Sequence, residues 1–165
     1  MATVNKARRG ETHMKSRMLV STLLVMLLLL VPAIDGYTDS VSSPERTQGL
    51  VAPAPQGDHQ LVALKGPGKF LSAQITKQGG TNDLTFVSLD IDGKNVVSMS
   101  IAAAKNWGLT ADNPYGVVLL QSTAGIETLT VGFNSPLEFR SELKLRVKVQ
   151  EPGVAQIVAN VIHGK

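Results

Sequence analysis

The chain of 165 residues contains no cysteine. No disulfide can therefore brace the fold, and no thiolate is available as a nucleophile or as a metal ligand. A lipid anchor attached to an N-terminal cysteine is excluded for the same reason. A domain of this kind must be held together by its hydrophobic core alone.

An excess of one charge sign is also absent outside the first 36 residues. That segment holds five of the 16 basic and two of the 13 acidic residues, so the remaining 129 residues carry 11 of each. These residues contain no cluster of Lys and Arg. A neutral domain without a basic patch lacks the electrostatic footprint of a nucleic-acid-binding protein, and we expect no nucleic-acid partner.

Histidine is rare as well. Beyond the first 36 residues the chain has only His59 and His163, and neither has a carboxylate or nucleophile at a spacing that indicates catalysis. Residues 90–95 resemble the start of a calcium loop but lack its third acidic position and its distal Glu, and a hairpin turn already explains their Asp and Gly. The sequence predicts no catalytic residue, no metal site and no cofactor.

The first feature that is present is a long apolar run. Residues 18–34 carry no charge, follow several basic residues and lead to the small Gly36. This order predicts a secretory signal peptide over residues 1–36 and a secreted or cell-surface location. The alternative is an uncleaved membrane anchor, for which the run is slightly short. Residues 1–13 make the basic region unusually long, and residues 8–11 can be encoded by a purine-rich tract of the ribosome-binding kind. We therefore expect a bacterial gene whose translation starts at Met14 instead.

The rest of the chain divides into two parts. Residues 37–58 are rich in Ser, Pro, Thr and Gly and have no hydrophobic period, which predicts a flexible tether or arm. Over residues 59–165, short apolar segments alternate with turn residues. We predict an all-β fold there, a single antiparallel β-sandwich or jelly-roll of about eight strands, long enough to bury one core.

The clearest strand signal is an alternation over residues 137–149. Apart from Ser141, the odd positions are apolar and the even positions are charged. Because side chains alternate across a strand, this pattern predicts one long strand with one face in the core and one in water. Similar reasoning predicts a turn at residues 134–136, a central strand at 117–121 and an interior strand at 154–163, which is apolar on both faces.

The segments 84–91 and 94–103 predict a β-hairpin. Asp92 and Gly93 favour a two-residue loop, which would pair odd positions with even ones. Most apolar residues of both segments are odd-numbered, so matched faces require an odd loop. We therefore predict a three-residue loop at 91–93 with a glycine bulge.

The longest interruption between strands, residues 102–116, carries the candidate ligand site. Aromatic rings flanked by amides and carboxylates are how β-sandwich modules stack on sugars and hydrogen-bond them. The candidate residues are Trp107, Tyr115, Asn106, Asp112 and Asn113. In the alternative interpretation, the single Trp plugs the end of the sandwich and is buried there.

The preferred function is that of an exported, non-catalytic structural or adhesive module that self-associates. Apolar residues left on the outer faces mark a candidate oligomer interface, namely Phe86, Val96 and Ile162. The alternative is a carbohydrate-binding module that uses the loop between Trp107 and Tyr115, with a glycan as its partner. A hydrolase of surface polymers is a third, less favoured hypothesis. Membrane contact is expected only through an uncleaved leader.

Overall fold

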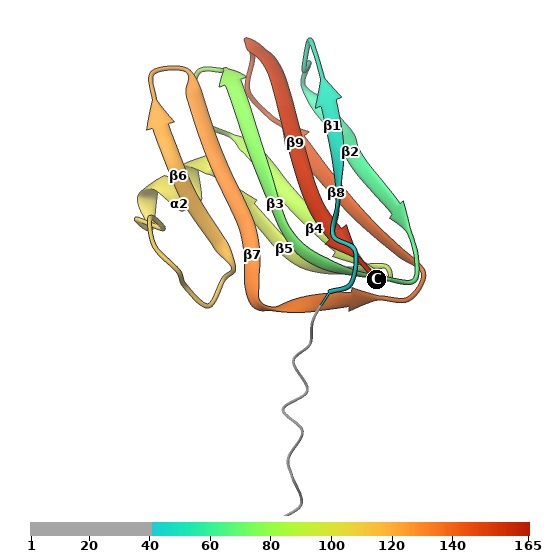
Figure 1. Cartoon of the computed structure of the whole chain (residues 1–165). Helices are drawn as coiled ribbons and strands as arrows, with labels where there is room; N and C mark the ends of the chain where they lie inside the picture. The colour runs from blue at the N-terminus through green and yellow to red at the C-terminus, as the bar shows by residue number, and fades with distance from the viewer. Residues whose placement is uncertain (1–40) are drawn as a thin grey trace, which may run out of the picture. The chain divides into compact units, whose positions relative to one another are not determined.

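The computed structural model describes residues 41–165, which form two antiparallel β-sheets packed face to face (Figure 1). The five-stranded sheet has the order β1-β9-β3-β7-β6 and the four-stranded sheet the order β2-β8-β4-β5. The predicted β-sandwich is confirmed, with nine strands in place of about eight. The elements are β1 (Glu45–Val51), β2 (Gly57–Lys65), β3 (Gly68–Gly79), β4 (Thr85–Ile91), β5 (Lys94–Ser100), α2 (Ile101–Asn106), β6 (Val117–Thr123), β7 (Ile126–Phe139), β8 (Glu142–Val149) and β9 (Val154–Gly164).

The core lies between the two sheets and follows the alternation of the sequence. In β8 the side chains of Leu143, Leu145, Val147 and Val149 are all buried, while the residues between them face water. Each such side chain contributes roughly 1.5–3 kcal/mol through the apolar area removed from water. The predicted core face of this segment is therefore correct.

The prediction of one unbroken strand over residues 137–149 is wrong. Phe139 ends β7 in the five-stranded sheet, and the chain crosses at Arg140 and Ser141 to β8 in the four-stranded sheet. Phe139 and Leu143 are both buried, because both sheets face the same core. The alternation therefore continues through the crossing, and the pattern alone hides the turn.

The turn predicted at residues 134–136 is also wrong, because these residues lie inside β7. Gly132 pairs with Ser72, and the next pair is Leu137 with Phe70, so four residues of β7 lie opposite the single Leu71. This large bulge accommodates Pro136, which has no N–H to donate to a ladder. The turn signal in the sequence marks a bulge here.

The apolar faces of β4 and β5 are matched as predicted, but by a bulge in β5 and not by a three-residue loop. Ile91 pairs with Lys94, so the loop has two residues, and both Asp92 (φ 50°) and Gly93 (φ 77°) have the positive φ of a type I′ turn. The extra residue lies in β5 instead. Asp90 pairs with Asn95 and Leu89 pairs with Val97, so Val96 between them has no partner in β4 and forms a bulge. The three-residue loop is wrong, but the matched faces that it was meant to explain are present.

The edges of the sheets differ from the prediction in two places. The segment expected to be a central strand is β6, at the edge of the five-stranded sheet. Part of the segment predicted as a tether or arm forms the opposite edge, since residues 45–51 are β1 and pair with β9. The last strand, β9, lies between β1 and β3 inside the sheet, as predicted.

The two sides of the sandwich close in different ways. At one side β1 and β2 approach closely, and a Cβ on Gly49 would lie 2.1 Å from the carbonyl oxygen of Leu61, so only glycine fits there. At the other side α2 packs against β4, β5 and β6, with Ile101 and Ala104 buried (Figure 1). The loop that follows α2 is held at this second side.

The signal peptide predicted over residues 1–36, and its proposed start at Met14, lie outside the described residues. Within residues 41–165, no helix has the length and apolar character needed to cross a membrane.

Candidate binding surfaces

Trp107 and Tyr115, the aromatic residues predicted to bind a ligand, lie against each other. Their ring centroids are 5.6 Å apart and their planes meet at 45°. Trp107 is 60% exposed and Tyr115 is 55% exposed. The alternative in which Trp107 plugs the end of the sandwich is therefore wrong. Large apolar side chains that stay exposed side by side indicate an interaction site.

The loop that carries the two rings is fixed at its start. Ser100 caps α2 by accepting a hydrogen bond from the N–H of Ala103 at 3.0 Å. Gly108 then takes a positive φ of 63°, which reverses the chain after Trp107. Leu109 is buried, and its carbonyl oxygen accepts the N–H of Leu119 at 2.6 Å. The loop is thus tied to β6.

Asn113 holds the second half of the loop. Its amide nitrogen donates to the carbonyl oxygens of Ala111 at 2.9 Å and Val117 at 2.7 Å. Its amide oxygen accepts the N–H of Tyr115 at 3.0 Å. Since these bonds occupy both ends of the amide, Asn113 positions the loop and does not offer its side chain to a ligand.

A cavity of about 400 Å³ lies beside the same loop. Asp112 and Asn113 line it, whereas Trp107 and Tyr115 do not. The predicted residues therefore divide between an exposed aromatic pair and a neighbouring cavity. Asp112 and Asn106 are exposed, and neither side chain has a hydrogen-bond partner within residues 41–165. The remaining lining residues are Pro114, Gly116, Val118, Gly132, Phe133 and Asn134.

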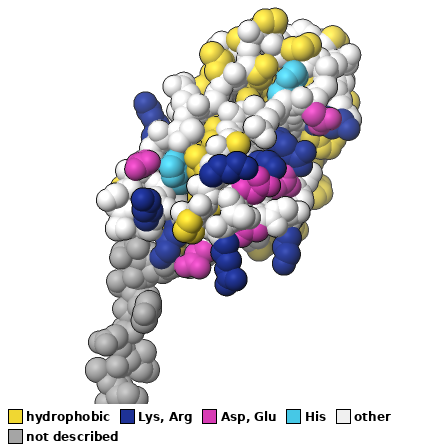
Figure 2. All heavy atoms as spheres, turned by 90° about the vertical axis from the view of Figure 1, so that its right-hand side faces the viewer, with side chains coloured by type: hydrophobic (Ala, Val, Ile, Leu, Met, Phe, Trp, Pro, Cys, Tyr) yellow, Lys and Arg dark blue, Asp and Glu magenta, His cyan; other side chains and the backbone are white. Residues whose placement is uncertain are grey.

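The outer face of the four-stranded sheet carries charges of both signs. Lys144 Nζ lies 2.6 Å from Glu142 Oε1, and Arg146 Nη2 lies 2.6 Å from Asp90 Oδ2. On the side of the domain seen in Figure 2, basic and acidic side chains likewise lie next to one another. Exposed pairs of this kind contribute about 0–1 kcal/mol each. This face is best explained as a solvated surface.

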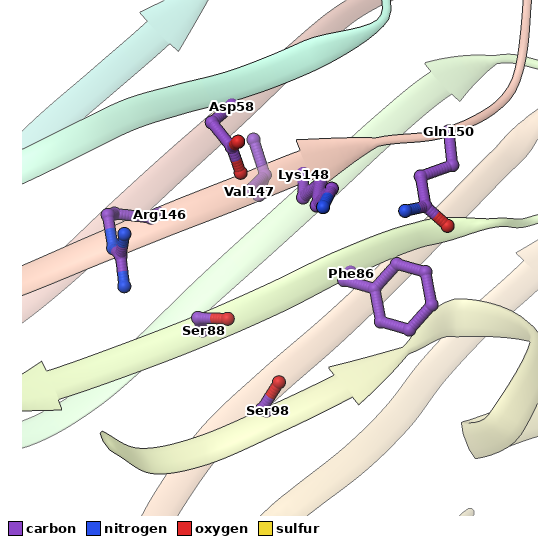
Figure 3. Close-up of a pocket in the computed structure, with 8 residues that line it drawn as sticks. All are labelled: Asp58, Phe86, Ser88, Ser98, Arg146, Val147, Lys148 and Gln150. Atoms are coloured by element: carbon purple, nitrogen blue, oxygen red, sulfur yellow. The ribbon is translucent and has the colours of Figure 1, made fainter. Parts of the chain in front are cut away.

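A polar hollow of about 240 Å³ lies on this charged face (Figure 3). The small side chains of Ser88 and Ser98 leave space beside the ring of Phe86, which is half-buried. Phe86, a candidate interface residue, is therefore one wall of a polar hollow. The other lining residues are Asp58, Arg146, Val147, Lys148 and Gln150.

The three residues of the candidate oligomer interface do not share one surface. Phe86 is in β4 and Val96 is in β5, both in the four-stranded sheet, whereas Ile162 is in β9 of the five-stranded sheet. Val96 is exposed because it is the bulged residue of its strand. Since the outer faces of the two sheets point away from each other, no single flat contact covers all three.

The outer face of the five-stranded sheet differs from the other face in being almost free of charge. Between the β7 bulge and the far end of the sheet, the pairing registers place four cross-strand rows on it, and Arg46 on the edge strand β1 is the only charged residue among them. Beyond the bulge, the same registers place a charged pair, Lys69 and Glu138, at the end of this sheet. Leu50, on the same strand, is 60% exposed. We call this set the uncharged face: Arg46, Gln48, Leu50, Ser72, Gln74, Thr76, Gln78, Val118, Gln121, Thr123, Ile126, Thr128, Thr130, Gly132, Gln156, Val158, Asn160 and Ile162.

A buried ion cluster, not predicted from the sequence, lies between the sheets. Lys77 and Glu151 are almost fully buried, and Lys77 Nζ lies 2.9 Å from Glu151 Oε1, 2.7 Å from Asp83 Oδ1 and 3.4 Å from Glu127 Oε2. Lys105 Nζ joins the cluster at 3.2 Å from Glu127 Oε1. The cluster links β3, β7, α2 and the turns before β4 and after β8. It holds the two sheets together at one end of the sandwich.

Glu151 is the most highly bonded residue of this cluster. Its Oε2 accepts the consecutive backbone N–H groups of Thr81, Asn82 and Asp83 at 2.8–3.0 Å, and its Oε1 accepts the hydroxyl of Thr85 at 2.8 Å. Burial alone would raise the pKa of Glu151. The hydrogen bonds from Lys77, Asn82 and Thr85 outweigh burial, and the pKa is lowered. The carboxylate is therefore ionised and structural.

Asp92 plays a similar part at the β7–β8 crossing. Its carboxylate accepts the N–H groups of Arg140, Ser141 and Glu142 at 2.8–3.0 Å and also the hydroxyl of Ser141. These bonds, led by that from the Arg140 N–H, hold the pKa of Asp92 far below its usual range. The hairpin turn of one strand pair thus fixes the crossing between the two sheets.

The histidines of the domain make local hydrogen bonds. His59 Nε2 donates to the carbonyl oxygen of Pro55 at 2.7 Å, and His163 Nε2 shares a hydrogen bond of 2.8 Å with the hydroxyl of Thr47. Within residues 41–165, no group of three His, Cys, Asp or Glu side chains is arranged to hold a metal ion.

No family model matches the chain, and no curated protein matches it. Several solved structures resemble it in fold. The capsid structure of Helicobacter pylori bacteriophage KHP30 is 13% identical with a TM-score of 0.48, over 75% of this chain and 89% of that one. The crystal structure of FLHE is 8% identical with a TM-score of 0.39, over 75% and 100%. A structure of infectious bursal disease virus, Gt strain, is 12% identical with a TM-score of 0.33, over 76% and 34%. At these identities the likeness concerns the β-sandwich fold alone.

Proposed function

We propose that this chain is an exported, non-catalytic structural module that assembles with further copies of itself. The observation that carries the proposal is the uncharged face of the five-stranded sheet. Exposed sheet faces of solvated domains normally carry charge, as the opposite face of this sandwich does. A face whose single charge, Arg46, lies on an edge strand can be buried against another surface with little cost of desolvating ions.

A second copy of the chain is the partner that best fits this face. The side chains of the uncharged face are Gln, Asn, Thr, Ser and aliphatic residues, with Arg46 at one edge. Such a surface offers hydrogen-bond donors and acceptors in equal measure and repels no copy of itself. A twofold contact would pair the same residues from both copies, the commonest arrangement in oligomers of identical chains.

The size of the face reaches the minimum expected of a biological interface. With a strand spacing of about 4.8 Å and a rise of about 3.3 Å per residue, its four rows across five strands cover roughly 550 Å². Two such faces together would bury on the order of 1,100 Å², slightly more than the ~1,000 Å² expected of a biological interface.

The test is a comparison of two charge substitutions by sedimentation velocity. Gln74 is exposed at the centre of the uncharged face, and Gln74→Lys should convert the oligomer into monomers by placing like charges opposite each other. Ser98→Lys, on the outer face of the other sheet, is the matched control and should leave the oligomer intact. A wild-type monomer at all concentrations, or equal effects of both substitutions, would contradict the proposal.

A further inference from the structure

The loop after α2 has a second set of properties that self-association does not explain. Trp107 and Tyr115 are among the most exposed large apolar side chains within residues 41–165, and they contact each other. Neither ring belongs to the uncharged face. An exposed aromatic pair of this kind, held in one loop, is a candidate contact for a partner of its own.

The rings are held in place before any ligand arrives. The buried Leu109 anchors the loop after Trp107, and the bonded amide of Asn113 fixes the backbone at Tyr115. A Cβ on Gly116 would lie 2.4 Å from the ring of Phe133, so the loop ends in close contact with β7. Because the loop is already ordered in the free protein, the entropic cost of ordering it on binding is small.

The exposed aromatic area is too small for a protein partner. Fully buried Trp and Tyr side chains each contribute about 150–250 Å². At exposures of 60% and 55%, the pair offers on the order of 250 Å², against ~800 Å² per partner in a standard protein interface. A small ring-shaped ligand matches this area better.

Polar residues close in sequence to the rings indicate the chemistry of that ligand. Asn106 precedes Trp107, and Asp112 lies in the same loop; both side chains are exposed and without hydrogen-bond partners within residues 41–165. A carboxylate and an amide can together bind hydroxyl groups, while the aromatic faces accept apolar C–H surfaces. We propose that this loop binds a neutral carbohydrate, whose ring stacks on Trp107 and Tyr115 while Asn106 and Asp112 take its hydroxyl groups.

The chain contains its own reporter for this site, because Trp107 is its only Trp. The full chain would be titrated with cello-, chito- and malto-oligosaccharides while the tryptophan emission is recorded. Stacking of a sugar removes water from the indole, so at least one series should give a saturable shift of the emission to shorter wavelength. No saturable shift with any of the three series would overturn the proposal.

Substitutions at Tyr115 separate stacking from other causes of a shift. Tyr115→Ala retains the reporter but removes half of the platform, and it should weaken binding about tenfold, equivalent to ~1.4 kcal/mol. Tyr115→Phe keeps the ring and should bind nearly as the wild type does. Val96→Ala, which removes an exposed apolar group elsewhere, should bind unchanged. Equal affinities of the Ala and Phe variants, or an emission shift produced by protein concentration alone, would overturn the proposal.

Discussion

At the scale of single residues, the position of Trp107 decides what its removal will cost. Truncating a buried Trp typically destabilises a protein by about 3–5 kcal/mol. Trp107 is 60% exposed, and we expect Trp107→Ala to change the free energy of unfolding by only about 0.5 kcal/mol. Urea unfolding followed by circular dichroism would measure this, and a loss of several kcal/mol would show that the ring supports the core.

Glu151 is the opposite case, a charged residue on which the fold depends. Glu151→Gln would remove the charge that faces Lys77 and leave that ammonium group buried with fewer partners. Because Lys77 keeps Asp83 and Glu127 as partners, we expect a loss of about 1.5–3 kcal/mol, the range for hydrogen bonds to charged groups. The matched control is Glu142→Gln on the charged outer face, where we expect little change because exposed ion pairs are screened by solvent. Urea unfolding would distinguish them, and equal losses would contradict the structural role of Glu151.

The same cluster predicts how stability depends on pH. The folded-state pKa values of Asp83 and Glu151 lie below their ordinary values of 3.8 and 4.5. A lowered carboxyl pKa contributes stability above the unfolded-state value, and this contribution is lost as pH falls through the folded-state pKa. The urea concentration at the unfolding midpoint should therefore decrease as the pH is lowered below about 4.5. The drop should be shallower in Glu151→Gln, and identical pH profiles would rule out this origin.

At the scale of elements, the sequence predicts the strands better than their connections. The buried rows of β4, β5 and β8 and the interior position of β9 follow from the alternation and are correct. The crossing at Arg140 and Ser141 is invisible, because Phe139 and Leu143 face one core from two sheets. Pro136 was expected to mark a turn, but it lies in a bulge of β7, and the sequence does not distinguish the two. Local patterns contain no information about which sheet a strand joins.

The ion cluster shows why charged sites were harder to predict than strands. Its members come from distant segments, and only the fold brings them together. One signal was present: Lys77 continues the buried row of Ala73 and Ile75, and Glu127 precedes that of Leu129 and Val131. A charged residue in register with a buried row indicates a buried ion pair. The exposure of Trp107, by contrast, depends on how its loop folds back on β6.

The connection between β4 and β5 has a role outside its own hairpin. Asp92 accepts three N–H groups at the β7–β8 crossing, so Asp92→Asn should keep the type I′ turn, which Asn favours, while weakening the crossing. We expect the thermal midpoint to fall by a few degrees. Asp58→Asn, on an exposed position without such bonds, is the control. Equal midpoints would show that the crossing forms without Asp92.

At the scale of the whole molecule, the two outer faces predict different responses to salt. Contacts between charged faces weaken as ions screen them, whereas burial of an uncharged surface does not. If the copies meet through the uncharged face, the oligomer should persist from low salt to about 1 M NaCl, where the screening length falls to ~3 Å. Sedimentation velocity at both salt concentrations measures this. Dissociation at high salt would assign the contact to the charged face of the other sheet.

The place of β9 also has a consequence for the order of events during synthesis. This strand is the last of the described elements, yet it lies between β1 and β3, and β1 has no other partner in its sheet. The five-stranded sheet therefore cannot close until β9 has left the ribosome. Until then β1 and one edge of β3 have no strand to pair with. This delay in folding is compatible with the export proposed above, which requires that the chain cross a membrane before it folds.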